Sequence, residues 1–204
     1  MPMNQSEALA PGGWLAGIRR RPSPHADLRP FGTQVELIVL HGVSLPRGEF
    51  GGRCVEDFFA GCLDFSWYPS LRELENLKVS PHLYIDRTGE VVQMVSLAHR
   101  AWHAGVSKWR GRTCCNDFSI GIELEGTDML PYTDAQYAAL GWLIPVLRRA
   151  FPLIAEDAVV GHSDIAPGRK TDPGPSFDWR RLRAAMVATR YNLKRGEMEE
   201  AAGK

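Results

Sequence analysis

The sequence predicts an α/β fold, in which helices pack on a central β-sheet. Residues 35–41, Val-Glu-Leu-Ile-Val-Leu-His, are nearly all apolar and rich in β-branched side chains, which is typical of a strand buried between helices on both sides. Residues 119–125, Ser-Ile-Gly-Ile-Glu-Leu-Glu, alternate polar and apolar residues and predict a second strand. A capping box over residues 133–136 precedes an apolar stripe at helical spacing, which predicts an amphipathic helix.

The length and charge of the chain limit its organisation and its partners. The 204 residues fit one domain, which we expect over residues 14–190, with flexible tails at residues 1–13 and 191–204. The 24 basic and 24 acidic residues balance to a net charge of zero, which does not favour nucleic acid or an anionic membrane as a partner. No apolar run approaches the ~20 residues that a membrane-spanning helix needs. We expect a monomer without nucleic-acid or membrane partners.

The cysteines and the N-terminus indicate the compartment. Cysteines 54, 62, 114 and 115 are not spaced as a disulfide framework, so we expect reduced thiols. The first residues lack the basic region and apolar core of a secretory signal. Together these features predict a cytoplasmic protein.

The remaining elements follow in chain order. Residues 14–34, with an arginine run and several prolines, predict an irregular arm over the surface. Residues 53–64 place apolar side chains at i, i+3, i+4 and i+8 and predict a helix. Residues 79–95 predict a β-hairpin with its turn at residues 86–89.

One proline and one aspartate are expected to shape the last two helices of the domain. Pro145 is expected to kink the amphipathic helix that begins after Thr133. Asp178 is expected to cap a last helix, whose inward face carries Trp179, Leu182 and Met186.

Two side chains near the hairpin are candidates for ligand binding. His82 shares a strand face with Tyr84, where a place in a pocket and a packing role are equally compatible with the pattern. Trp102 lies in the loop-like residues 96–118 and suits either stacking on a sugar or packing as a half-buried aromatic. The residues alone leave both alternatives open.

Glu123 is the unusual residue of the second strand, because it shares a face with Gly121 while apolar residues form the other face. In a strand that is covered on both faces, an unpartnered carboxylate would be costly, which indicates a metal-bound water or a proton transfer nearby. The alternative is a strand with one wet face, on which Glu123 and Glu125 simply meet solvent.

Residues 159–176 predict a shaped loop that carries chemistry. Two valines suggest a short strand, and the prolines and glycines that follow exclude a regular helix or strand. His162, Lys170 and Asp172 lie within this stretch, and the two-residue spacing of Lys170 and Asp172 points their side chains to one side in an extended segment.

His41, His162 and Asp172 together suit a zinc ion, because three protein ligands leave a fourth position for water. Zinc lowers the pKa of that water to about 7. Glu123 can take its proton, and Lys170 can neutralise the oxyanion of a tetrahedral intermediate. This set is sufficient for amide hydrolysis. The spacing of the three ligands matches no known pattern, so a metal-free binding domain stays open as the alternative.

Longer stretches carry a family resemblance over roughly residues 12–182. The most specific is Gly-His-Ser-Asp-Ile-Ala-Pro-Gly-Arg-Lys-Thr-Asp-Pro-Gly-Pro at 161–175, and others lie at 13–15, 21–25, 45–52, 100–107, 116–128 and 132–137. The chain resembles the AmpD-type N-acetylmuramoyl-L-alanine amidases, which belong to the zinc amidase superfamily with phage T7 lysozyme and the peptidoglycan recognition proteins.

The resemblance implies a fold, a cofactor and a reaction. The fold is a mixed sheet with packed helices, and the cofactor is zinc held by His41, His162 and Asp172. Glu123 is implied as the catalytic acid and base, and Lys170 as the group that stabilises the oxyanion. The family hydrolyses the amide between N-acetylmuramic acid and L-alanine, and AmpD-type members do so on anhydromuropeptides during cytoplasmic cell-wall recycling.

The substrate contacts are where the chain departs from the family. Gly42 stands where the family usually has Asn, and Cys114 where it usually has Arg. Lys78 replaces a second expected Arg, which keeps the charge but loses the bidentate fork. We expect substrate contacts from four residues, Lys78, His82, Trp102 and Leu124.

Two alternatives to a recycling amidase remain. One is an amidase that acts on polymeric peptidoglycan, which an export signal or a wall-binding module would favour. The other is a protein that binds muropeptide without cutting it. Loss of a metal ligand would indicate the second, and all three ligands are present.

Overall fold

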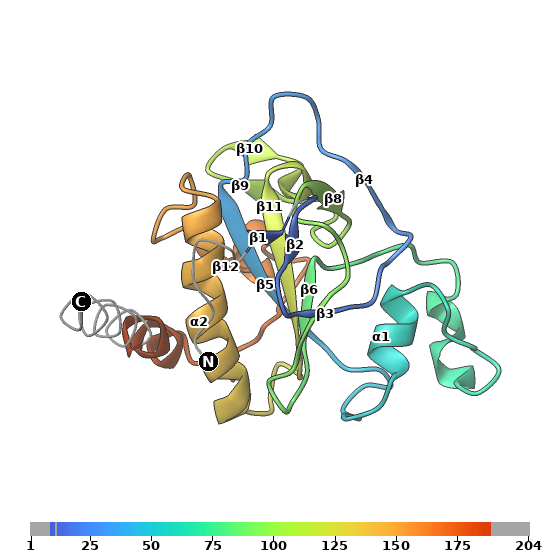
Figure 1. Cartoon of the computed structure of the whole chain (residues 1–204). Coiled ribbons are helices and arrows are strands. Elements are labelled where there is room, and N and C mark those ends of the chain that lie inside the picture. The colour runs from blue at the N-terminus through green and yellow to red at the C-terminus, as the bar shows by residue number, and fades with distance from the viewer. Residues whose placement is uncertain (1–8, 11, 189–204) are drawn as a thin grey trace.

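A six-stranded mixed β-sheet forms the centre of the computed structural model, which describes residues 9–10 and 12–188 (Figure 1). The first four strands in the order β12-β5-β11-β6-β7-β3 run parallel, β7 is antiparallel to β6, and β3 is parallel to β7. The strands are β3 (Arg19–Arg20), β5 (Leu37–Val43), β6 (Leu83–Ile85), β7 (Val91–Gln93), β11 (Ser119–Glu125) and β12 (Val159–Gly161). The α/β class with a mixed sheet is therefore confirmed.

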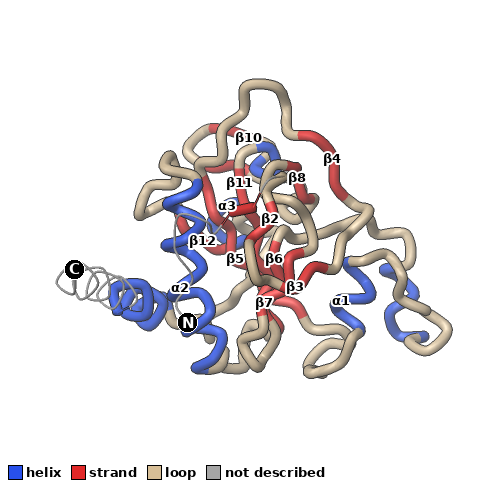
Figure 2. Tube along the Cα trace, viewed as in Figure 1, coloured by secondary structure: helices blue, strands red, loops and turns tan. Residues whose placement is uncertain are grey.

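Helices cover both faces of this sheet, as the continuous apolar character of β5 predicts (Figures 1 and 2). Helix α2 (Asp134–Ala150) packs on one face, where its apolar stripe meets Ile120, Ile122 and Leu124 of β11 in the main core. Helix α1 (Cys54–Phe59) lies on the other face and forms a smaller core with Tyr84. The alternation predicted for β11 is thus confirmed.

The hairpin of β6 and β7 also follows its pattern. Leu83 and Ile85 belong to the main core and Tyr84 to the smaller one, because successive strand residues point to opposite faces. Asp86 Oδ1 accepts hydrogen bonds from the backbone N–H groups of Thr88 and Glu90 at 2.9 Å each, which closes the turn.

Capping interactions begin α2 and the helical residues 179–188 where the sequence predicts them. The backbone N–H of Gln136 donates to Thr133 Oγ1 at 3.2 Å, and the backbone N–H of Thr133 donates to Gln136 Oε1 at 3.0 Å. Asp178 Oδ1 accepts from the N–H groups of Arg180 and Arg181, at the start of the helical residues 179–188. Pro145 lies inside α2, and its kink stays a prediction.

The N-terminal segment is more regular than its sequence predicts. The expected arm over residues 14–34 instead contributes β3 to the central sheet. Strand pairs of two or three residues are too short to carry a hydrophobic alternation, so their backbone pairing left no signal. These pairs are β1 (Leu9–Ala10) with β2 (Trp14–Leu15) and β4 (Ala26–Leu28) with β8 (His99–Ala101).

The predicted tails lie largely beyond the structure. Residues 9 and 10 of the expected tail at residues 1–13 are paired in β1, while residues 1–8 and 11 and the expected tail at residues 191–204 lie outside the described residues. The remaining short elements are η2 (Pro69–Leu74), β9 (Lys108–Trp109), β10 (Arg112–Thr113), η3 (Cys115–Asp117) and α3 (His162–Ile165). None of the helices in the described part of the chain combines the length and apolar character needed to cross a lipid bilayer.

Candidate metal centre and active site

The carboxyl ends of three neighbouring parallel strands carry the central side chains of the site. His41 belongs to β5, Glu123 to β11, and His162 follows the last residue of β12. His41 and Glu123 are partners in the register of β5 and β11. Carboxyl ends of parallel strands meet at one edge of a sheet, which is where open α/β folds build their sites.

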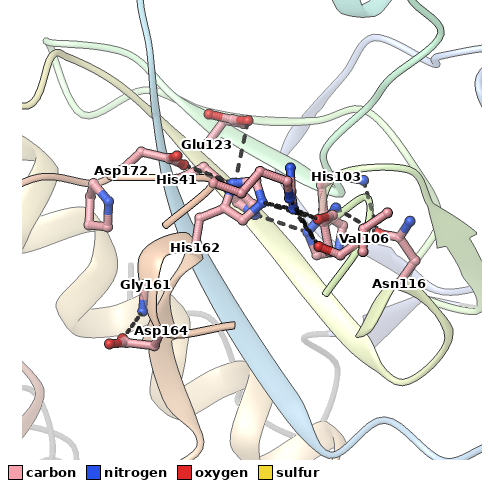
Figure 3. A network of polar contacts seen from close by, with 12 residues as sticks. His41, His103, Val106, Asn116, Glu123, Gly161, His162, Asp164 and Asp172 are labelled. Atoms are coloured by element: carbon pink, nitrogen blue, oxygen red, sulfur yellow. Dashed lines mark hydrogen bonds and ion pairs between the residues drawn. The ribbon is translucent and has the colours of Figure 1, made fainter. Parts of the chain in front are cut away.

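Three potential metal ligands converge at this edge (Figure 3). His41 Nδ1 lies 2.9 Å from His162 Nδ1, and Asp172 Oδ2 lies 3.3 Å and 3.1 Å from these two nitrogens. Tetrahedral zinc with bonds of about 2.0–2.1 Å separates its ligand atoms by about 3.3 Å. The three atoms therefore fit around a single ion of this size.

Two hydrogen bonds to backbone carbonyls hold the chain at the candidate ligand Asp172. Ser163 N–H donates to Asp172 O at 3.0 Å, and Tyr132 Oη donates to Pro173 O at 2.9 Å. A Cβ at Gly42 would lie 2.4 Å from that tyrosine oxygen. The absence of a side chain at residue 42 therefore leaves the Tyr132 hydroxyl room to anchor this loop.

Burial and charge keep the two ligand types in their metal-binding forms. Burial lowers the pKa of His41 to about 4, so its imidazole is neutral at pH 7. Burial opposes ionisation of Asp172, but its close contacts with the imidazole rings of His162 and His41 outweigh burial and hold the pKa of Asp172 below its usual range. Neutral imidazole and ionised carboxylate are the forms that bind zinc.

Glu123 is a largely buried carboxyl group without a full set of partners. Its side chain is 13% exposed, its Oε1 lies 4.0 Å from His41 Nδ1, and its Oε2 has no hydrogen-bond partner. Burial and the nearby Asp172 raise the pKa of Glu123 well above its usual value, while Lys170 lowers it. A raised pKa and an unpaired oxygen are features of a group that moves a proton.

Glu125 provides the structural contrast on the same strand. It is 1% exposed, and its carboxylate accepts hydrogen bonds from the N–H groups of Gly51 at 2.8 Å and Arg87 at 3.0 Å. Neither glutamate lies on a wet face, so that alternative is wrong. Glu125 joins two loops, and Glu123 faces the candidate metal ligands.

Two of the four residues expected to bind substrate are accessible. Lys78 is exposed. Trp102 is half-buried, its Nε1–H donates to Asp27 Oδ1 at 3.1 Å, and its ring stacks parallel to His25 with centroids 6.3 Å apart. The stacking and the hydrogen bond hold the indole in place, and its substrate contact stays a prediction.

The side chains of His82 and Leu124 differ from that expectation. Both are 0% exposed, so neither side chain has surface to offer a ligand. Gly121 N–H donates to His82 Nδ1 at 3.0 Å, and Leu124 packs in the core beside α2. For His82 the packing alternative describes the structure, because the face it shares with Tyr84 is covered.

Comparison with protein-family models matches residues 31–175 to the family described as N-acetylmuramoyl-L-alanine amidase. The chain belongs to this family. The amidase is 55% identical over 171 residues to "1,6-anhydro-N-acetylmuramyl-L-alanine amidase AmpD" of Escherichia coli (strain K12), covering 84% of this chain and 93% of the relative. The enzyme class predicted from the sequence is confirmed.

Solved structures agree with this assignment. A crystal structure of a selenomethionine AmpD derivative matches the amidase with a TM-score of 0.83 at 54% identity, covering 87% of this chain and 98% of the other. AmiD from E. coli, in complex with its substrate anhydro-N-acetylmuramic acid-L-Ala-D-gamma-Glu-L-Lys, matches with a TM-score of 0.56 at 31% identity, covering 77% and 60%.

No prediction from the sequence covered the polar residues behind the candidate metal ligands. His103 Nδ1 lies 2.9 Å from His41 Nε2, and Asn116 Oδ1 accepts from the backbone N–H groups of His103 and Ala104. These residues lie in loop-like sequence, where no periodicity relates them to the strands. A histidine beside the candidate Trp102 was the one available signal.

Proposed function

We propose that the amidase hydrolyses the amide bond between the lactyl group of anhydro-N-acetylmuramic acid and the L-alanine of a muropeptide, with zinc as its cofactor. The observation that carries this proposal is the convergence of His41, His162 and Asp172 beside the unpaired carboxyl group of Glu123. The names of the AmpD and AmiD relatives support the substrate class.

The donor set supports zinc as the metal. Two imidazole nitrogens and one carboxylate oxygen form a ligand set typical of catalytic zinc sites, with one coordination position left open. When bound, zinc polarises a carbonyl and lowers the pKa of a water molecule to near neutrality. Calcium and magnesium favour oxygen ligands and fit this set less well.

Glu123 supplies the proton transfer that amide hydrolysis needs. Its carboxylate takes a proton from the attacking water, and the protonated carboxyl then gives that proton to the leaving nitrogen as the C–N bond breaks. The products are the lactyl carboxylic acid and the free amine of L-alanine. The raised pKa of Glu123 means that its carboxylate holds a proton more readily than an ordinary glutamate, which suits a group that takes a proton and then donates it.

Lys170 supplies positive charge to the reacting carbonyl. Its side chain is exposed, and its charge lowers the pKa of Glu123, so its field acts at the site. An ammonium group near a developing oxyanion stabilises the transition state more than the ground state. Lys170 and Asp172 share the loop after α3, so that loop brings both the ligand and the cation.

We also propose that the amidase works as a monomer in the cytoplasm during cell-wall recycling. The four cysteines are free thiols in the structure, which is compatible with a reducing compartment.

Release of peptide from a defined muropeptide tests the proposed reaction. Zinc-loaded protein is incubated with anhydromuramyl-tripeptide, with and without a chelator, and free tripeptide is measured by mass spectrometry. We expect release that disappears with the chelator and returns with added zinc. Release that persists after verified metal removal would contradict the proposal that zinc is the cofactor.

A matched pair of substrates separates the recycling amidase from its alternatives. Zinc-bound protein that spares the tripeptide substrate but releases peptides from intact peptidoglycan would replace the proposed substrate with the polymer. Binding of the muropeptide without any cleavage would instead support a recognition protein. We expect cleavage of the anhydromuropeptide.

A further inference from the structure

His103 is the buried neighbour of the first metal ligand (Figure 3). It lies on the loop after β8 and is not one of the three converging ligand residues. Its Nδ1 is 2.9 Å from His41 Nε2. The two rings meet edge to face, with an interplanar angle of 82°. The contact lies on the side of His41 that faces away from Asp172 and His162.

The hydrogen-bond chain behind His103 has only one consistent direction. Ser119 Oγ donates to the carbonyl oxygen of Cys115 at 2.6 Å, because a carbonyl can only accept. The hydroxyl proton is thereby used, so Ser119 Oγ accepts at its contact with His103 Nε2, 3.1 Å away. The proton of the neutral His103 ring therefore lies on Nε2.

The direction of these hydrogen bonds determines which ring nitrogen of His41 carries the proton. With its proton on Nε2, His103 presents the lone pair of Nδ1 to His41 Nε2, which must donate. The lone pair of His41 then lies on Nδ1, the nitrogen that faces the metal centre. The opposite direction would place a proton on His41 Nδ1 and block it as a ligand.

The same loop orients the second histidine ligand. His162 Nε2 lies 3.1 Å from the carbonyl oxygen of Ala104, which can only accept, and 3.4 Å from Arg169 Nη2, which can only donate. The shorter contact places the proton of His162 on Nε2 and its lone pair on Nδ1. Asn116 Oδ1 accepts from the N–H groups of His103 at 3.0 Å and Ala104 at 2.8 Å. One amide side chain thus holds the backbone of both residues.

The His103 ring has room because residue 121 of β11 is a glycine. A Cβ at Gly121 of β11 would lie 2.3 Å from His103 Cγ, and the ring could not occupy its present place above any larger residue. Gly121 is two residues before Glu123, so one strand face provides both the room for this ring and the proposed base.

We propose that His103 is a positioning residue for the metal centre, which holds His41 in the tautomer and ring orientation that bind zinc, with Ser119 holding His103 in turn. The inference rests on the proposed zinc site and extends it to residues that touch neither metal nor substrate. Partners of this kind, bonded to the free nitrogen of a ligand histidine, are worth about 10–100-fold in metal affinity.

Zinc affinity, measured by competition with a chromophoric chelator, tests this role independently of turnover. We expect His103→Ala to weaken zinc binding by about 10–100-fold. Ser119→Ala should weaken it less, because the ring stays while its Nε2 proton loses its acceptor. His103→Asn, whose Oδ1 can stand near the place of Nδ1, should recover part of the loss of His103→Ala.

Ser96→Ala is the matched control for the serine variant. Ser96 is also a buried serine whose hydroxyl donates to a backbone carbonyl, that of Gly12, and no contact links it to the ligands. We expect its zinc affinity to equal that of the wild type. If His103→Ala does not fold, Ser119→Ala, which removes a single oxygen, still decides the outcome.

Long-range ¹H–¹⁵N spectra of the histidine rings test the assignment without any variant. In zinc-loaded wild type we expect a neutral His103 with its proton on Nε2. A proton on Nδ1, or unchanged zinc affinity in every one of the two variants Ser119→Ala and His103→Ala that folds, would overturn the role of His103 and leave the metal site standing. A wild type that binds no zinc would overturn the metal site as well.

Discussion

His41 and Glu123 are register partners on neighbouring parallel strands, and 4.0 Å separates His41 Nδ1 from Glu123 Oε1. Register partners share a face of the sheet, so backbone pairing brings the first ligand beside the proposed base. A slip of one residue would turn one of these side chains to the opposite face. The pairing of β5 with β11 is therefore a structural condition for the proposed chemistry.

Glu123→Gln tests the proton transfer. The amide keeps the shape of the side chain but cannot take a proton, so we expect kcat to fall by about 10²-fold or more. Zinc content should remain that of the wild type, because Glu123 is outside the ligand set. Steady-state kinetics and metal analysis on one preparation check both statements, and an unaltered kcat would reject the role.

The same variant should stabilise the metal-free protein at neutral pH. The folded pKa of Glu123 is raised by burial and by Asp172, so the fold favours its protonated form. The protonated Glu123 therefore adds to the free energy of unfolding. This added stability is fully present below the unfolded pKa of about 4.5 and is lost as the pH rises through the folded pKa. Gln does not ionise, so the variant does not lose stability in this way as the pH rises.

Thermal unfolding of the chelator-treated proteins measures the difference. The Tm of Glu123→Gln should exceed that of the wild type at about pH 7, and the gap should narrow toward about pH 4. A gap that stays constant between these conditions would show that the folded pKa of Glu123 is not raised.

Asp172→Ala should lower the zinc content of the purified protein, because the ligand set drops to two histidines. Asp157→Ala provides the comparison, since Asp157 is a surface carboxylate that pairs with Arg110. Metal analysis after dialysis should find full zinc in Asp157→Ala and a deficit in Asp172→Ala. Equal occupancy in the two variants would remove Asp172 from the site.

Lys170→Met should lower kcat by about 10²–10³-fold, the usual cost of losing one group that stabilises an oxyanion. Folding should be unaffected because the side chain is exposed. The acid limb of the kcat/KM profile should move to higher pH, because Lys170 lowers the pKa of Glu123. An unchanged limb together with an unchanged kcat would exclude Lys170 from the reaction.

Lys78→Met should separate binding from chemistry. Lys78 is exposed and is predicted to contact the substrate, so its loss should raise KM while kcat stays near the wild-type value. Steady-state kinetics on anhydromuramyl-tripeptide check this split. A fall in kcat equal to that of Lys170→Met would show that the two lysines do not have separate roles.

Periodicity predicted the strands and helices that carry the site. The alternation of β11 separated Glu123 from the apolar face, and the apolar run of β5 ended at His41. The family resemblance supplied the ligand set, which spacing alone did not, because the ligands come from separate strands and a loop. The structure brings these residues together in the predicted combination.

Loop residues and burial by distant segments were harder to predict. His82 was left between two roles, because nothing in a strand pattern shows that Arg29 and β11 cover it. His103 was missed since its partner His41 is 62 residues away in sequence. Leu124 was expected to contact substrate, but its side chain follows the apolar face of its strand into the core.

Anomalous diffraction at the zinc absorption edge, from crystals of the zinc-loaded amidase, tests the central claim most directly. We predict one strong peak about 2 Å from His41 Nδ1, His162 Nδ1 and the Asp172 carboxylate. Stoichiometric zinc that gives its peak elsewhere, or a peak that contacts only one of these three side chains, would contradict the proposed metal centre.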